Sequence, residues 1–167
     1  MRIARARRRP TGLAAALIVC LLPLLAPSGA NAAPSADWPI GGAWVRLPVI
    51  PDPDWLPGHR GLDLAGYVGQ LVRSPVSGNV FWVGEVNHVP AITIRSSGGL
   101  KHTLQPVRSN LAAGDPVSRG EPVGTISAGN HCRVACLHWS VREGRQYLDP
   151  RWLLPPWVYR LPIHARG

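Results

Sequence analysis

The chain has 167 residues, and 18 Lys and Arg against nine Asp and Glu give it a formal net charge of +9. A nucleic-acid-binding protein needs a clustered basic face, but five of the basic residues lie within the first nine positions and the others are scattered. The composition therefore argues against a nucleic-acid partner. The modest excess of positive charge that remains after residue 32 suits an anionic polymer such as a bacterial envelope.

The first 32 residues have the three parts of a secretory signal peptide. A basic start, Met1 to Arg9, precedes an apolar run from Gly12 to Ala26 and a small-x-small site at residues 30–32. A membrane anchor is the alternative, but it needs roughly 20 apolar residues, and this run is shorter and contains Pro23. We expect export, a mature chain that begins near Ala33, and no stable membrane span in it.

Residues 33–57 form a lead-in that is rich in proline and tryptophan. Proline this dense excludes helices and central strands, so the lead-in is expected to wrap the domain or to border a groove. The tryptophans have two interpretations. Either they pack the lead-in onto the domain, or some of them stack on a ligand.

Residues 58–154 predict one all-β domain, and residues 155–167 a C-terminal tail. Turn residues separate short β-prone pieces at Leu71–Val72, Val80–Val83, Ala91–Ile94, Thr103–Leu104 and Pro122–Ile126. No stretch has a sustained apolar period of 3.6 residues, so we expect at most one short helix, near Pro150 to Leu154. The predicted fold class is an antiparallel β-sandwich or barrel-like single domain.

Two short segments carry residues with metal-binding chemistry. The first is His59-Arg60-Gly61-Leu62-Asp63. In an extended chain successive side chains alternate, so His59 and Asp63 are expected on one face and Arg60 on the other. Gly61 leaves space between the two candidate ligands.

The second segment is Cys136-Leu137-His138-Trp139, which presents Cys136 and His138 on one face. With the first segment it supplies two imidazoles and a carboxylate. This is the ligand set of a catalytic zinc site, which leaves one position to water, whereas a structural site closes all four positions with protein atoms. The alternative is structural: the first histidine caps a turn, the aspartate meets a nearby donor, and His138 is a core histidine.

The order of motifs along the chain resembles the lysostaphin-type zinc metallopeptidases, peptidase family M23. The resemblance rests on residues 59–63, 69–72, 74–80, 84, 99–100, 114–124, 136–139 and 148–150 and extends over about 58–154. It implies a secreted β-sandwich of the duplicated hybrid motif type that uses one zinc ion to cut peptide cross-links in peptidoglycan. It also implies that the zinc ligands are His59, Asp63 and His138.

The chain departs from the family pattern at both catalytic histidines. Cys136 occupies the first position of the family's His-x-His motif, and the Tyr-x-His-Leu segment matches residues 104–107, which places Pro106 at the other histidine. The role of these histidines would be to accept a proton from the attacking water and to stabilise the oxyanion. Gln105 is adjacent but points to the other face unless a bulge turns it. Its amide can donate a hydrogen bond but cannot act as a base.

His131 is the other candidate for the missing catalytic group, because it lies in a glycine-flanked loop near the expected cleft. The alternative is that it is a surface histidine with no special role. His102 lies roughly 13 Å along an extended strand from Pro106, which is too far without a register shift.

Cys132 and Cys136 are the only cysteines after residue 32. In an exported protein an even count favours a disulfide between them. A nucleophilic Cys136 would need a free thiol and a neighbouring base. A closed zinc site that includes both cysteines would leave His59 and Asp63 without a role.

Two functions follow from these expectations, both outside the cytoplasm and associated with the cell wall. The first is a zinc metalloendopeptidase that acts on peptidoglycan peptides, with an atypical base or with the metal alone. The second is a non-catalytic module of the same fold that binds wall peptides or regulates another wall hydrolase. Intact metal ligands favour the first, and the replaced histidines favour the second.

Overall fold

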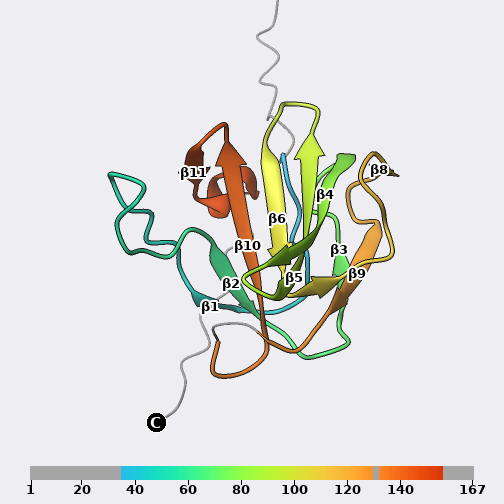
Figure 1. Cartoon of the computed structure of the whole chain (residues 1–167), viewed down its shortest axis with the longest axis horizontal. Helices are drawn as coiled ribbons and strands as arrows, with labels where there is room; N and C mark the ends of the chain where they lie inside the picture. The colour runs from blue at the N-terminus through green and yellow to red at the C-terminus, as the bar shows by residue number, and fades with distance from the viewer. Residues whose placement is uncertain (1–34, 130–131, 156–167) are drawn as a thin grey trace, which may run out of the picture. The chain divides into compact units, whose positions relative to one another are not determined.

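The computed structural model describes residues 35–129 and 132–155, which form two antiparallel sheets and one short 3-10 helix (Figure 1). The expected signal peptide, His131 and most of the expected tail lie outside the described residues. The strands are β1 (Trp44–Arg46), β2 (Leu62–Ala65), β3 (Leu71–Arg73), β4 (Gly78–Val86), β5 (Val89–Ser96), β6 (Lys101–Gln105), β7 (Val107–Arg108), β8 (Pro116–Val117), β9 (Pro122–Ile126), β10 (Cys136–Glu143) and β11 (Gln146–Leu148). The helix, η1, is Pro150–Leu153.

The larger sheet has the strand order β1-β2-β10-β6-β5-β4-β8, with β11 paired to β10 (Figure 1). The smaller sheet has the order β3-β9-β7. All pairings between these strands are antiparallel. The predicted all-β antiparallel fold is confirmed.

One hydrophobic core joins the two sheets. The large sheet contributes Leu62, Leu64, Ile92, Ile94, Leu104, Leu137, Trp139 and Val141, and the small sheet contributes Val72, Val107, Val123 and Ile126. Burial alternates along β6 and along β10 from Trp139 to Arg142, because successive side chains of a strand point to opposite faces. One face of β6 and β10 is therefore packed into the core, and the other remains available for a site.

The lead-in is part of the large sheet and does not form a separate body. Its β1 is an edge strand on β2, and Trp38 and Trp44 are partly buried against the core. Trp55 is 78% exposed and makes no such packing. An edge position suits a proline-rich segment, since proline cannot donate to a central ladder.

Helix η1 begins where a short helix was expected. The Asp149 side chain accepts a hydrogen bond from the backbone N–H of Arg151 at 2.9 Å, and Pro150 begins the helix with a residue that has no N–H to satisfy. No helix among residues 35–129 and 132–155 is long and apolar enough to span a membrane.

Candidate metal centre and groove

Three buried residues, His59, Asp63 and His138, converge at one end of β2 and β10. The two strands pair so that His138 lies directly opposite Asp63. His59 precedes β2 and is held by a two-way backbone bridge with Val49. Their exposed fractions are 5%, 0% and 8% in chain order, so water competes little for their ligand atoms.

The ligand atoms of these residues lie within 4.8 Å of one another. Asp63 Oδ1 is 2.7 Å from His138 Nδ1 and 3.1 Å from His59 Nε2. His59 Nδ1 lies 2.8 Å from the Leu47 carbonyl oxygen, which can only accept, so Nδ1 carries the proton and the Nε2 lone pair points to Asp63. A backbone carbonyl that accepts from the second ring nitrogen is one of the common ways to orient a metal-binding histidine. The donor set and its orientation fit a zinc ion.

The space left by Gly61 is used by His138. A Cβ atom at Gly61 would lie 2.6 Å from both Cε1 and Nε2 of the His138 ring, and 2.6 Å from the Trp139 carbonyl oxygen. Real Cβ atoms essentially never approach that closely. Glycine at this position therefore leaves room for the imidazole to lie beside Asp63.

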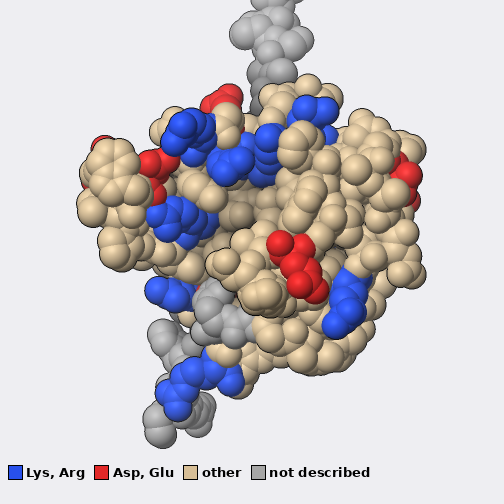
Figure 2. Space-filling view, viewed as in Figure 1, with Lys and Arg blue, Asp and Glu red and all other residues tan. Residues whose placement is uncertain are grey.

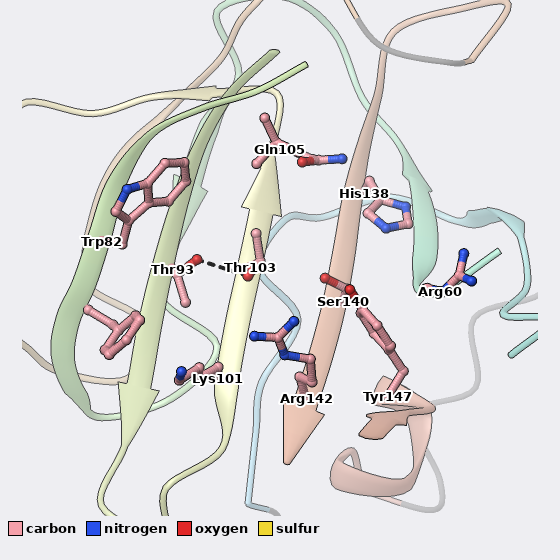
Figure 3. A pocket seen from close by; sticks show the side chains of 12 residues that line it. Arg60, Trp82, Thr93, Lys101, Thr103, Gln105, His138, Ser140, Arg142 and Tyr147 are labelled. Atoms are coloured by element: carbon pink, nitrogen blue, oxygen red, sulfur yellow. Dashed lines mark hydrogen bonds between the residues drawn. The ribbon is translucent and has the colours of Figure 1, made fainter. Parts of the chain in front are cut away.

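Beside these candidate metal ligands an open groove of about 450 Å³ runs over the large sheet (Figure 3). Figure 2 shows Lys and Arg side chains gathered around the hollow in this face. The groove is lined by Arg60, Phe81, Trp82, Val86, Thr93, Lys101, Thr103, Gln105, His138, Ser140, Arg142 and Tyr147. These lining residues include three cations and neither Asp nor Glu.

Gln105 lies in this groove, although alternation from Pro106 predicted that it would point away from the site. Gln105 is the last residue of β6 and pairs directly with His138, so its side chain projects beside the metal centre (Figure 3). Pro106 is buried between β6 and β7. The position that faces the metal centre from β6 is therefore occupied by glutamine.

Arg60 also differs from expectation, because its side chain lines the groove on the side of His138. The chain is not yet a regular strand at Arg60, since β2 begins at Leu62, and strict alternation does not apply there. Its guanidinium donates to the Leu56 carbonyl at 2.8 Å and also to the Asp54 carbonyl.

The expected disulfide between Cys132 and Cys136 is present, with a Cα separation of 6.2 Å. Cys132 Sγ lies 3.7 Å from Asp63 Oδ2, so the bridge borders the metal centre. Cys136 is therefore neither a free thiol nor a zinc ligand in this structure.

His102 does not reach the groove. It lies on the core face of β6, is fully buried, and stacks near Trp139 with 6.1 Å between ring centroids. Burial lowers the pKa of His102 to about 4, so this ring is neutral at physiological pH.

The chain matches the family model described as Peptidase family M23 over residues 57–150. It is 37% identical over 161 residues to an uncharacterized protein of Mycobacterium tuberculosis, an alignment that includes 90% of this chain and 64% of the relative. The chain thus spans less than two thirds of the length of that relative.

Solved structures show the same fold. The antimicrobial peptidase lysostaphin from Staphylococcus simulans superposes with a TM-score of 0.58 at 16% identity, over 74% of this chain and 56% of lysostaphin. A zinc-containing peptidase from Vibrio cholerae superposes with a TM-score of 0.55 at 20% identity, over 66% of this chain and 37% of that one. The fold and the matched sequence define a peptidase-type β domain. The chain belongs to Peptidase family M23.

Proposed function

We propose that this chain is an exported, zinc-binding peptidase domain that acts slowly on peptidoglycan peptides at the cell wall. The observation that carries the proposal is the convergence of His59, Asp63 and His138 at one end of an open groove. Membership of a family of peptidases supports the reaction class, and the solved zinc-containing relative supports the metal. The signal-like residues 1–32 support export.

His59, Asp63 and His138 would hold the metal ion. When bound, zinc acts as a Lewis acid that polarises a peptide carbonyl and makes water a competent nucleophile near neutral pH. The side-chain amide of Gln105 lies beside this centre and can donate a hydrogen bond to the oxygen that becomes negative during attack. The groove orients the peptide so that one carbonyl reaches this end.

Slow turnover follows from the proton-transfer groups. Apart from the ligand His138, the described groove residues offer no imidazole or carboxylate, and the amide of Gln105 cannot accept a proton as a base. A positioned general acid or base contributes typically about 10²- to 10⁴-fold to a rate. A protein that lacks a general acid or base can still bind and orient the peptide, but it cleaves the peptide much more slowly.

A second candidate function is a non-catalytic module that holds wall peptides or regulates another wall hydrolase. The observation that favours it is the same glutamine, which occupies the position facing the metal centre from β6. The two functions differ in one outcome, the formation of new amino termini.

Purified, zinc-loaded mature protein incubated with peptidoglycan and cross-linked muropeptides tests both functions, with mass spectrometry used to detect new amino termini. We expect slow, chelator-sensitive cleavage that is lost in Asp63→Ala. Replacing Gln105 by histidine puts a general base beside His138 and should raise the rate by about 10- to 100-fold.

Exposed His88, replaced by asparagine, serves as the matched control, because it lies outside the groove lining. Cleavage by neither wild type nor Gln105→His, with zinc bound in both, would favour the binding module. Equal cleavage by wild type and Asp63→Ala would exclude this metal centre as the active site.

A further inference from the structure

The floor of the groove is a three-strand ladder whose side chains change in character with distance from the metal centre. Strands β5, β6 and β10 pair in register, so residues directly opposite one another form rungs across the sheet. Three rungs lie on the groove face of the sheet: a metal rung of Gln105 and His138, a hydroxyl rung of Thr93, Thr103 and Ser140, and a cation rung of Arg95, Lys101 and Arg142. All of these residues line the groove except Arg95, which is exposed beside it.

The hydroxyl rung lies between the other two (Figure 3). Thr93 Oγ1 and Thr103 Oγ1 are 2.9 Å apart and hydrogen-bonded to each other. Hydroxyl groups donate and accept, so this rung can bond the N–H and C=O groups of a peptide laid along the strands. The hydroxyl rung therefore offers polar groups that carry no charge.

The cation rung places three positive side chains on adjacent strands. Strands are about 4.8 Å apart, and like charges directly opposite one another destabilise a sheet. No described carboxylate forms an ion pair with any of the three cations. An anion bound at this rung would offset their mutual repulsion.

Aromatic rings hold these cations in place. Lys101 Nζ lies 4.0 Å from the centroid of the Phe81 ring, and Arg95 Cζ lies 5.0 Å from the same centroid. On the other side Arg142 Cζ lies 5.7 Å from the Tyr147 ring. Cation–π contacts position the charges but do not neutralise them.

The wall of the groove on β4 depends on an irregularity of that strand. The pairing of β4 with β5 shifts between Val80 and Trp82, so Phe81 is an extra residue. As a result two consecutive aromatic side chains, Phe81 and Trp82, line the groove together. The Trp82 ring packs on Gly84, where a Cβ atom would collide with it.

We propose that the cation rung binds a free carboxylate of the peptide that occupies the groove, an inference that rests on the proposed function. Arg142 is four residues from His138 along β10, so the cation rung lies about 13 Å from the metal rung at about 3.3 Å per residue. An extended peptide covers this length with about four residues. The groove therefore selects an anionic peptide whose carboxylate lies about four residues from the carbonyl at the metal centre.

A matched pair of peptides tests the proposal. One wall-type pentapeptide is made with a free terminal carboxylate and again with a terminal carboxamide, and each is titrated into mature protein by calorimetry. The zinc content of the same protein sample is measured in parallel. We expect the carboxylate form to bind wild type about 10- to 100-fold more tightly, as charge-assisted hydrogen bonds to the half-buried Lys101 and Arg142 allow.

Variants assign this preference to the cation rung. Lys101→Gln combined with Arg142→Gln should reduce the carboxylate preference to about one-fold, whereas Arg108→Gln removes an exposed charge from β7 and should preserve it. Lys101→Arg keeps the charge and should keep most of the preference. The carboxylate preference should also weaken as salt is raised, because salt screens charges that are partly exposed to solvent.

The spacing is tested with peptides that carry a zinc-binding hydroxamate at one end and the carboxylate at the other, separated by two to six residues. Binding should be tightest near four residues in wild type and independent of length in the double variant.

Equal binding of the carboxylate and carboxamide pentapeptides, or a preference that survives in Lys101→Gln/Arg142→Gln, would overturn the subsite. A carboxylate preference without cleavage would leave the subsite standing and contradict the peptidase proposal. Cleavage without any carboxylate preference would support the peptidase proposal and overturn the subsite.

Discussion

The two faces of β6 and β10 show how the same strands produce a core and a site. On the core face lie Leu104, Trp139 and Val141, all fully buried. The groove face of the same two strands carries the metal, hydroxyl and cation rungs. Along a strand, successive side chains point to opposite faces. Residues of the core and residues of the site can therefore alternate in the sequence, and a polar site can lie directly over an apolar core.

His138 and His102 lie on opposite faces of the large sheet and have different surroundings. His138 on the groove face lies 2.7 Å from Asp63, within the candidate metal centre. On the core face of β6, His102 is fully buried, and neither of its ring nitrogens has a hydrogen-bond partner among the described residues. Histidine is therefore a candidate metal ligand on the groove face, whereas on the core face it is a buried polar group that destabilises the fold. The face of the sheet, and not the residue type, decides its chemistry.

The largest expected effect is on the groove face. Replacing His138 by alanine leaves two of the three ligands, and the protein should retain no zinc at micromolar metal, whereas wild type retains one ion per chain. Metal analysis of dialysed protein measures this directly. His88→Asn, an exposed control, should keep its zinc. Equal zinc in wild type and His138→Ala would contradict the assigned centre.

The next effect concerns the core face and pH. The pKa of His102 is about 4 in the folded protein and 6.5 when unfolded, because burial penalises the charged ring. As pH falls from about 6.5 to 4, the unfolded chain therefore takes up a proton that the folded protein does not, and stability is lost. The shift corresponds to about 3 kcal/mol of unfolding free energy.

His102→Leu should remove this part of the pH dependence and preserve stability at pH 7, because it replaces a polar ring that lacks partners with an apolar side chain. Urea denaturation of both proteins from pH 7 to pH 4 measures the difference. Parallel stability curves for wild type and variant would show that His102 is not the group responsible.

The smallest expected effect concerns Gly61, which lies against both the His138 ring of the groove face and the backbone of Trp139. Gly61→Ala adds a Cβ atom that would lie 2.6 Å from the His138 ring and from the Trp139 carbonyl oxygen. The ring must move, and zinc affinity should fall by about 10- to 100-fold, the usual cost of disturbing the orientation of a ligand. Competition with a chromophoric chelator measures the affinity.

Gly98→Ala is the matched control, since its added Cβ atom would meet only the Ser96 hydroxyl at 3.9 Å. An unchanged zinc affinity in Gly61→Ala, with the fold intact by circular dichroism, would show that His138 has room to reorient.

Much of the fold and the residues of the candidate metal centre could be predicted because the information is local or carried by residue type. Alternating apolar pieces and glycine turns predicted the all-β class, and two cysteines four positions apart predicted their disulfide. The spacing of His59 and Asp63 placed both on one face of an extended segment. Gly61 between them predicted the space that the His138 ring fills.

Other features of the groove depend on long-range pairing. Gln105 faces the metal centre because β6 pairs in register with β10 up to that residue, whereas counting from Pro106 placed it on the opposite face. Phe81 and Trp82 both line the groove because β4 has an extra residue, which nothing in their local pattern indicates. Arg60 reaches the groove because the chain before β2 is irregular.

By itself, the sequence determined the β class, the disulfide partners and the chemical types of the candidate metal ligands, because these depend on residue identity and on short spacings along one segment. Only the tertiary structure decided that Arg95, Lys101 and Arg142 form one rung about 13 Å from His138. These residues come from three strands, and a shift of one residue in any pairing would turn that strand's side chains to the other face. Register is fixed by packing of the whole sheet against its core, so no single stretch of the chain contains it.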